Sequence, residues 1–493
     1  MKLKVKLISS AVVAALGAVA GTAQAVNVSQ DGQGQVLIYP YYSAQTKGTT
    51  AMDTYVTIVN SDSVRGKAVK VRFIEGKASR EVLDFNLYLS PNDMWTGVVT
   101  RDASGNPILQ TNDTSCTAPE MTLVSGTTRQ AAFVNYAYAG DGAKDDSLNR
   151  AREGYVEVIQ MADLTSGVLT TAGKFDTFKA AKHAAGVPAN CAGIRAAWLS
   201  ADYSTATDGM SVPTGTLSGY TTLINPLEAT DVTVDAVAIE SFSNVANHQA
   251  PGSIQPDLSA VTPKISNVLS GRNVYNTDWE EAIFNGLTSA VPVSGALMRD
   301  AIVNEYAVAA APVGLGTDWV VTFPTKRLHT LAPVHAPFVQ GLAVISTTGR
   351  CETVALSAYD REEGEQQTGL QFSPPPPAGV NSLCWESNVV SISNGSATSN
   401  VLGGANTRQV LPMPFASGWL RMGFTAASQE ISGALIGANT IMTPLGGAPA
   451  AATTYTYEGL PVVGFMVQSY LNTGTLANYG GTSTHRYNRN IHQ

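Results

Sequence analysis

Short segments rich in β-branched and aromatic residues recur along this chain, and they constrain its fold more than any other feature. Residues 54–60, 68–76 and 82–90 alternate apolar with polar side chains or run in Val, Ile, Tyr and Phe. Asn, Asp, Ser and Gly separate these segments and supply turn geometry. Similar segments follow, among them VTVDAVAIESF, DWVVTFPTKRL and LPVVGFMVQSYL. The pattern predicts a mainly β protein with two or more antiparallel β-sandwich domains, immunoglobulin-like or jelly-roll-like, and a few short helices.

Residues 1–25 have the layout of a secretion signal peptide. Three lysines lie among the first six residues, residues 7–20 are mostly apolar, and residues 23–25 (Ala-Gln-Ala) offer the small side chains that signal peptidase accepts. The apolar part is shorter than the roughly 20 residues that a membrane-spanning helix needs. No cysteine follows it, which argues against a lipoprotein anchor. We therefore expect cleavage after Ala25 and a mature chain that begins at Val26.

The 493-residue chain is too long for one ordinary hydrophobic core. Pro, Gly and Asn collect at residues 244–262, so we place an N-terminal β-sandwich region at residues 26–245 and a C-terminal one at residues 246–493. The formal net charge is −8 and no basic run occurs, which argues against nucleic-acid binding because phosphate contacts need clustered Lys and Arg. No later stretch is apolar without interruption over 18 residues, so no transmembrane helix is expected in the mature chain.

Four cysteines, Cys116, Cys191, Cys351 and Cys384, are expected to form two disulfide bonds in an exported chain. Four cysteines allow three pairings. We favour Cys116–Cys191 with Cys351–Cys384, because this arrangement keeps each bond within one half of the chain. A metal site is the competing interpretation, and the lack of a C-x-x-C pair or a nearby His argues against it. No metal and no cofactor is predicted.

Two segments favour helices. Residues 174–185 (KFDTFKAAKHAA) are followed by Gly186 and Pro188, which commonly end a helix. In TDWEEAIFNG, Thr277 and Glu280 have the spacing of a capping box. We therefore expect a helix at each place.

Two segments within residues 26–245 resemble each other in sequence. Residues 55–60 (YVTIVN) resemble residues 220–225 (YTTLIN), and each segment precedes an alternating strand. A duplicated sandwich explains this similarity, and so does chance, because β-rich sequences reuse Tyr, Thr and Val. Both explanations stay open.

No motif that defines an enzyme class occurs in the chain. Gly32-x-Gly34 lacks the third glycine and the following helix of a dinucleotide-binding loop. No G-x-S-x-G, H-E-x-x-H, P-loop or S-x-x-K pattern is present, and the six histidines are scattered. Each absence excludes one motif-defined enzyme class and no more, and no catalytic residue is assigned from the sequence.

Two acidic clusters have two interpretations each. Asp141, Asp145 and Asp146 lie in a Gly-containing loop, where a weak calcium site competes with a solvated turn, and the EF-hand spacing is missing. Residues 359–366 (YDREEGEQ) place four carboxylates at the end of a predicted strand. Paired carboxylates hydrolyse glycosides only at defined separations, and a charged hairpin tip is the simpler interpretation.

The segment QVLIYPYY (residues 35–42) contains Tyr39, Tyr41 and Tyr42. These side chains are either a stacking platform for a sugar or packing residues of a half-buried strand. With the two-residue period of a strand, Tyr39 and Tyr41 share one face and Tyr42 points to the other, which favours packing. Pro40 cannot donate to a ladder, so the strand should lie at a sheet edge or end its pairing there.

Several long segments carry a resemblance. They include VSQDGQGQVLIYPYY, AVKVRFIEGKASREVLDFNLYLSPNDMW, GTDWVVTFPTKR, CETVALSAYDREE and LPVVGFMVQSYLN. The chain resembles, over nearly its whole mature length, a family of large exported and cell-surface proteins of Gram-negative bacteria. The resemblance implies export and a bacterial source, and it implies no catalytic residue.

These features predict a non-enzymatic exported protein, structural or interacting, that is extracellular, periplasmic or at the cell surface. We expect it to self-assemble when a terminal strand pairs with a neighbour's sheet edge, so its partners are further copies or other cell-surface components. The main alternative is a carbohydrate-binding or carbohydrate-active secreted protein, with a glycan as ligand. A second alternative is an outer-membrane β-barrel, for which the polar C-terminal segment STHRYNRNIHQ is a poor terminal strand.

Overall fold

The protein is mainly β, and strands make up about half of the residues that the structure describes. The computed structural model describes residues 24–48, 50–139, 145, 147–166, 175–199, 203, 209–312, 314–331, 334–338, 351–366, 369–373, 381–395, 397–404, 406–424, 429–440, 454–472 and 477–492. Within these ranges the strands form five large sheets and four two-stranded ones. Their ladders are antiparallel apart from one parallel pair. The predicted antiparallel β-sandwich fold with a few short helices is confirmed.

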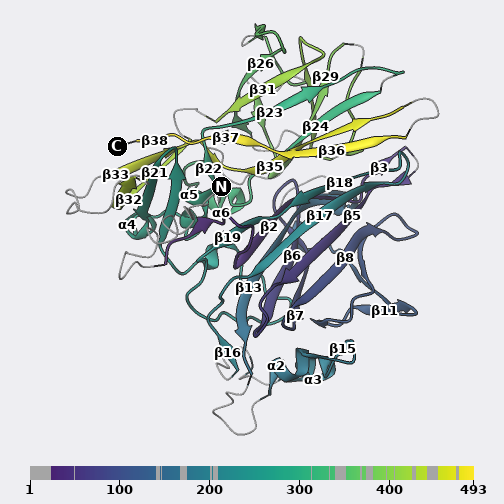
Figure 1. Ribbon diagram of the computed structural model, residues 1–493, viewed down its shortest axis with the longest axis vertical. Helices are drawn as coiled ribbons and strands as arrows, with labels where there is room; N and C mark the ends of the chain where they lie inside the picture. Colours follow the sequence, from purple (N-terminus) through teal and green to yellow (C-terminus); the bar gives the residue numbers. More distant parts are fainter. Residues whose placement is uncertain are drawn as a thin grey trace, which may run out of the picture.

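Two sheets face each other in the N-terminal half (Figure 1). Sheet I has the order β1 (Asn27–Val28), β19 (Val237–Glu240), β2 (Val36–Ser43), β13 (Glu153–Leu164), β6 (Gly66–Glu75), β7 (Glu81–Leu89) and β10 (Cys116–Ala118), with β16 (Met210–Ser211) beside β13. Sheet II has the order β11 (Thr122–Ser125), β12 (Thr128–Ala132), β9 (Pro107–Thr111), β8 (Asp93–Arg101), β5 (Asp53–Asn60), β17 (Leu217–Asn225) and β18 (Thr230–Asp235). They enclose a core that includes the fully buried side chains of Leu37, Val71 and Trp95.

The two segments with similar sequences are neighbouring strands of one sheet. β5 and β17 pair antiparallel, with Tyr55 opposite Thr222 and Tyr220 opposite Thr57. Thr and Tyr on adjacent strands form favourable cross-strand pairs, and both segments supply them. The similarity therefore does not mark equivalent strands in two separate sandwiches.

The C-terminal half contains a second sandwich and a further sheet. Sheet III runs β20 (Ile265–Ser270), β21 (Asn273–Asp278), β32 (Glu430–Thr440), β33 (Thr454–Glu458) and β38 (Ile491–His492). Sheet IV runs β27 (Glu365–Gln366), β26 (Ala355–Tyr359), β31 (Ser417–Gly423), β23 (Ala301–Ala307) and β37 (Arg486–Asn488). Sheet V runs β30 (Arg408–Pro412), β29 (Ser387–Ser393), β24 (Leu315–Thr322), β35 (Val463–Tyr470) and β36 (Tyr479–Thr484). Trp319 and Leu420 belong to the core between sheets IV and V.

Four two-stranded ladders complete the strand pairing of the described residues. They are β3 (Thr46–Lys47) with β4 (Thr50–Ala51), β14 (His183–Ala184) with β15 (Val187–Pro188), β22 (Met298–Arg299) with β34 (Leu460–Pro461), and β25 (Glu352–Thr353) with β28 (Ser382–Leu383). The α-helices are α2 (Thr177–Ala181), α3 (Cys191–Ala197), α4 (Glu280–Phe284), α5 (Val291–Leu297) and α6 (Lys326–Thr330). The described residues also form the short 3-10 helices η1 (Tyr136–Tyr138), η2 (Leu148–Arg152) and η3 (Leu258–Ala260). No helix in the described ranges is long and apolar enough to cross a membrane.

Both predicted helices are shorter than their sequence patterns indicated. α2 ends at Ala181 because the chain turns into the β14–β15 hairpin. The predicted capping box is wrong: α4 follows Trp279 as its N-cap, and Thr277 belongs to β21. The Thr277 hydroxyl is hydrogen-bonded to Tyr457 Oη at 2.6 Å, so a tertiary contact replaces the local one.

Two hydrophobic clusters contain residues from both halves of the chain. In one, Tyr41 packs with Val320 and Phe465 of sheet V. In the other, Val36 packs with Leu297 of α5. The halves therefore share buried apolar surface, and the boundary between residues 245 and 246 stays a prediction.

Candidate functional site

The three tyrosines of β2 are fully buried. Every hydroxyl has a partner inside the protein, as expected for buried Tyr side chains. Tyr39 donates to Thr57 O (2.7 Å), Tyr41 to Glu153 Oε2 (2.8 Å) and Tyr42 to Ala151 O (3.0 Å). Their rings therefore pack against protein and offer no solvent-facing platform to a sugar.

The predicted alternation of these tyrosines is wrong because β2 contains a β-bulge. Tyr39 lies opposite Val156 on β13, whereas Tyr42 lies opposite Gly154, so β2 has one extra residue between them. Tyr39 and Tyr42 consequently point into the core of the first sandwich, and Tyr41 points toward the C-terminal half. The bulge turns Tyr41 into a residue of the contact between the halves.

The opening strand is also not a sheet edge. β2 lies between β19 and β13 and is buried along its whole length. Pairing with β19 covers Val36 to Ile38 and stops before Pro40. The ladder therefore does not need the backbone N–H that proline lacks. Strand addition to another molecule therefore cannot use β2.

Tyr41 and Thr407 bring a buried carboxylate to the contact between the halves. Glu153 is fully buried, and its Oε1 accepts from the Thr407 N–H at 2.7 Å. Burial raises the pKa of Glu153 to about 7, although the hydrogen bonds from Tyr41 and Thr407 and the charge of Lys77 act in the opposite direction. This carboxyl group therefore titrates near neutral pH.

The predicted calcium loop is described only at Asp145, and Asp141 and Asp146 lie outside the described residues. Asp145 accepts hydrogen bonds from Lys77 Nζ at 2.9 Å and from the Ser147 hydroxyl at 2.8 Å. Burial raises the pKa of Asp145, but the hydrogen bonds from Lys77 and Ser147 together with the charge of Lys77 outweigh it and lower the pKa below its ordinary value. In the described part of the chain, no group of three His, Cys, Asp or Glu side chains is arranged to hold a metal ion.

Both predicted disulfide bonds are present. Cys116–Cys191 joins the edge strand β10 to α3, across a sequence separation of 75 residues. Cys351–Cys384 joins the two ends of the segment that contains sheet IV strands β26 and β27, across 33 residues. Each bond lies within one half of the chain, as the sequential pairing requires.

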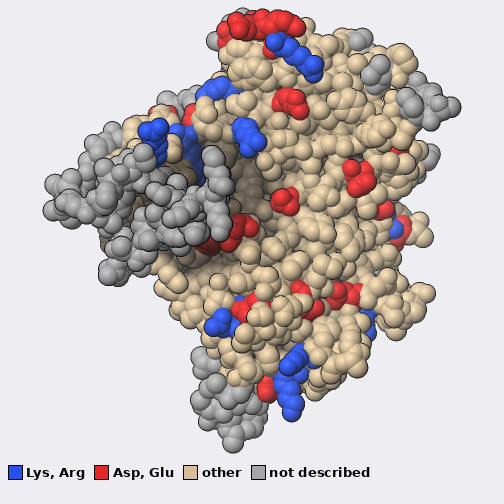
Figure 2. Space-filling model, in the orientation of Figure 1, with Lys and Arg blue, Asp and Glu red and all other residues tan. Residues whose placement is uncertain are grey.

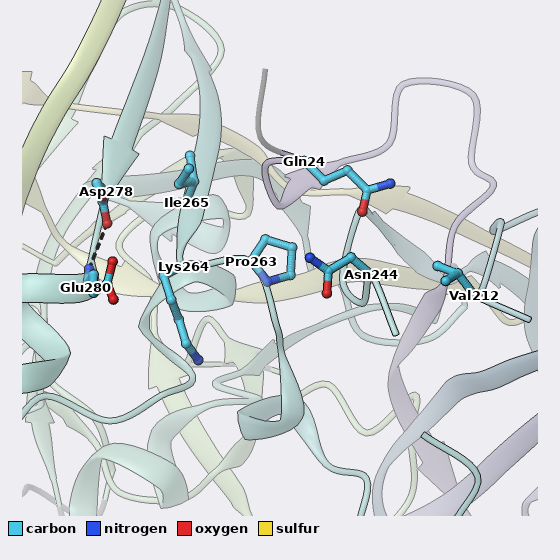
Figure 3. Close-up of a pocket in the computed structure, with 8 residues that line it drawn as sticks. All are labelled: Gln24, Val212, Asn244, Pro263, Lys264, Ile265, Asp278 and Glu280. Carbon is cyan, nitrogen blue, oxygen red and sulfur yellow. Dashed lines mark hydrogen bonds between the residues drawn. The ribbon is translucent and has the colours of Figure 1, made fainter. Parts of the chain in front are cut away.

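An open cleft of about 570 Å³ lies where the N-terminal segment meets sheet III (Figure 3). Asp278 and Glu280 lie together on one side, and the Glu280 N–H donates to Asp278 Oδ1 at 2.8 Å. Gln24 lines the opposite side. Lys264 also lines the cleft. Burial lowers the pKa of its amine, whereas the charge of Glu280 acts to raise it. The remaining lining residues are Val212, Asn244, Pro263 and Ile265.

Acidic side chains gather over one end of β26, at the top of the molecule (Figure 2). Beside this loop, Tyr359 of β26 stacks on Trp419 of β31, with ring centroids 3.9 Å apart and ring planes within 9°. Trp419 is 39% exposed, and Glu305 of β23 lies opposite it on the other side. The charged hairpin tip predicted at residues 359–366 thus adjoins an exposed aromatic pair.

β11 is the outermost strand of sheet II, at the lower right of Figure 1. All four of its residues are exposed, and Leu123 and Val124 are 57% and 45% exposed. The strand carries no charged side chain. A Gly126-Thr127 turn with positive φ at Gly126 connects it to β12, as favoured in two-residue hairpins.

Neither β11 nor the Tyr359–Trp419 pair was predicted as a site from the sequence. TLVS is too short to stand out as a strand, although the turn after it was a usable signal. Comparison with protein-family models, with curated proteins and with solved structures gave no match.

Proposed function

We propose that this chain is a non-enzymatic exported protein with a structural role at the cell surface or outside the cell, and that copies of it assemble by strand pairing. The arrangement of residues 1–25 and the two disulfide bonds support export. The exposed, uncharged edge strand β11 supports assembly, and it is the observation on which the proposal depends.

An edge strand presents unpaired backbone N–H and C=O groups that can bind another strand. Proteins that remain monomeric commonly protect such an edge with Lys, Pro or a covering segment. The edge of sheet I at β10 follows this pattern, because α3 is attached to it by the Cys116–Cys191 bond. β11 has neither a charge nor a covering helix among the described residues; its protection is limited to its four-residue length and a register shift between Leu123 and Ser125 in its pairing with β12.

The sequence of β11 fits a second copy of itself. In an antiparallel pair about a two-fold axis, Thr122 lies opposite Ser125 of the other copy, and Leu123 lies opposite Val124. Apolar side chains then meet apolar side chains, and hydroxyl groups meet at both ends. Because the paired segment is short, we expect association that is weak and strengthens with protein concentration.

Sedimentation velocity over a hundredfold range of concentration tests this proposal. The wild-type protein should shift from monomer to dimer, and Leu123→Lys should keep it monomeric because a charge is placed at the pairing edge. Leu227→Lys is the control, since Leu227 is 51% exposed but lies in the turn between β17 and β18. Dimers that persist in Leu123→Lys, or a wild-type chain that stays monomeric, would contradict the proposal.

A second candidate function is glycan binding at the Tyr359–Trp419 pair. Exposed aromatic side chains bind the apolar faces of sugars, and carboxylates beside them accept hydrogen bonds from sugar hydroxyls. Trp419 is exposed, and the side chains of Glu362 and Glu363 in the adjoining loop are also exposed. This arrangement favours the carbohydrate-binding alternative over an enzymatic one.

Affinity chromatography on immobilised polysaccharides separates this function from assembly. Trp419→Ala should abolish retention on a column that retains the wild-type protein. Tyr479→Ala is the matched control, because Tyr479 is a 60% exposed aromatic residue on β36. Equal retention of all three proteins would rule out a glycan site at Trp419.

A further inference from the structure

The chain enters the contact between its two halves within three residues. Gln24 is exposed, Ala25 is half-buried and Val26 is fully buried. The Val26 N–H donates to Ile265 O at 2.8 Å, and Val26 O accepts from the Asn267 N–H at 2.8 Å. Both bonds are made to β20, so Val26 lies against the edge of sheet III.

The residues that follow pair with sheet I. β1 lies beside β19 with Asn27 opposite Glu240, and the Ser29 N–H donates to Ala238 O at 2.9 Å. Residues 26–29, which we call the N-terminal joint, therefore lie between β20 and β19. They cover one edge of each sheet, and both edges would otherwise expose unpaired backbone groups.

The side chain of Val26 strengthens this connection. It belongs to a buried cluster that contains Phe242 and Ile239 from the N-terminal half. The same cluster contains Val293 and Leu297 of α5 from the C-terminal half. The first residue of the expected mature chain is thus part of the shared core.

Burial of Val26 conflicts with proteolysis of the folded chain. A protease must bind an extended backbone on both sides of the bond that it cuts, and exposed loops and termini are its usual substrates. Here the backbone groups of Val26 are hydrogen-bonded and its side chain is buried. The Ala25–Val26 bond is therefore accessible only before residues 26–29 pair with β19 and β20.

We propose that the Ala25–Val26 bond is hydrolysed before the chain folds, and that the N-terminal joint then docks as the strand that closes the two halves onto each other. This inference rests on the proposed export. Water supplies the oxygen of the new Ala25 carboxylate, and the nitrogen of Val26 becomes an ammonium group. Ile265 O accepts one of its protons. The other protons face the space that Gln24 and Ala25 leave.

The cleft in Figure 3 suits this ammonium group. Gln24 is one of its lining residues, so removal of residues 24 and 25 leaves a path from the cleft to the Val26 nitrogen. Water can enter along this path and hydrate the remaining protons. Asp278 and Glu280 give the opposite wall two carboxylates, which favour a positive charge nearby, and Lys264, which interacts with Glu280, offsets part of their charge.

The rate of cleavage tests the order of events. The full chain from Met1, once folded, should be cut by signal peptidase at least tenfold more slowly than the same chain diluted from urea directly into the enzyme. Equal rates would overturn the proposal. N-terminal sequencing of the product separates the two proposals, because a first residue other than Val26, or no cleavage of either sample, contradicts the expected signal peptide instead.

Hydrogen–deuterium exchange tests docking without any leader. A chain that begins at Gln30 should exchange the amides of the β20 segment with Asn267 at least tenfold faster than a chain that begins at Val26. The segment with Val134, whose N–H donates to Val82 O at 2.8 Å, is the control and should not change. An added Val-Asn-Val-Ser peptide should restore the slow exchange.

A point substitution keeps this test usable if the shortened chain does not fold. Val26→Gly retains the backbone bonds to β20 and removes the buried side chain, so it should accelerate exchange of the same segment by a smaller factor. Unchanged exchange in both the shortened chain and Val26→Gly would show that residues 26–29 do not join the halves.

Discussion

The side chain of Tyr39 spans the core of the first sandwich, and its hydroxyl group donates to Thr57 O on the facing sheet. Gly219 makes room for it, because a Cβ atom at this position would lie 2.2 Å from Tyr39 Oη and 2.2 Å from Thr57 O. A tyrosine that looks like a ligand residue in the sequence is therefore a packing residue whose polar end is satisfied inside the protein. The same holds for Tyr42.

Gly219→Ala should lower the stability of the protein, because Thr57 O is a backbone atom and cannot move away alone. Overpacking of this kind costs about 1–3 kcal/mol, which thermal unfolding resolves as a lower Tm. Gly481→Ala on β36 is the control, since no heavy atom lies within 4 Å of its added Cβ. Equal Tm values for the two variants would show that the Tyr39 contact does not constrain the fold.

Glu153 makes stability depend on pH. Its pKa is about 7 in the folded protein and near 4.5 in the unfolded chain, so the folded state binds the proton more tightly. The stability contributed by this group is fully present below about pH 4.5 and is lost as pH rises toward 7. Glu153→Gln should match the wild-type protein near pH 4.5 and exceed it at pH 8 by up to about 3 kcal/mol.

Urea unfolding at both pH values measures this difference. The amide introduced by Glu153→Gln can keep both contacts, because its oxygen accepts from the Thr407 N–H and the Tyr41 hydroxyl can rotate to accept from its nitrogen. A variant that is less stable than the wild-type protein at pH 8 would show that Glu153 is charged and stabilising in the folded state.

At the scale of elements, the sequence predicts where strands lie along the chain, but it does not predict which strands neighbour each other in a sheet or which residues become buried. Residues 54–60, 68–76 and 82–90 correspond to β5, β6 and β7, because alternation and turn residues act locally. The position of β2 inside sheet I was not predictable in this way, since its neighbours β19 and β13 lie more than 100 residues along the chain. The exposure of β11 and the burial of Val26 likewise depend on distant segments.

The sequential disulfide pairing was predictable because it needed only the division of the chain into halves. The Cys116–Cys191 bond holds α3 over the β10 edge. Replacing Cys116 and Cys191 together by Ala should lower the free energy of unfolding by about 4 kcal/mol on the chain-entropy model.

Replacing Cys351 and Cys384 together should cost slightly less, because that bond closes 33 rather than 75 residues of sequence separation. Chemical unfolding of both double variants measures the two losses. A larger loss for Cys351–Cys384 would show that local packing, rather than restriction of the unfolded chain, determines the effect.

At the scale of the whole molecule, the two halves behave as one packed body. Apolar clusters join them, and hydrogen bonds add to these contacts: the Thr322 hydroxyl donates to Pro40 O at 2.8 Å, and the Ser387 N–H donates to Gly76 O at 2.8 Å. Figure 1 shows β36 of the C-terminal half running beside β18 of the N-terminal half, so each of these strands shields the edge of the other. β11 lies away from this contact and stays accessible in the assembled molecule.

The central claim is that β11 pairs antiparallel with β11 of a second copy, and cysteine cross-linking tests it most directly. All four native cysteines form disulfide bonds, so Thr122→Cys and Ser125→Cys each add a single free thiol. The two-fold register places residue 122 opposite residue 125, close enough for a disulfide bond. Mild oxidation of an equal mixture should therefore give a mixed covalent dimer, and either variant alone should give little. Equal dimer yields from the single variants, or a mixture that stays monomeric at every concentration, would contradict the claim.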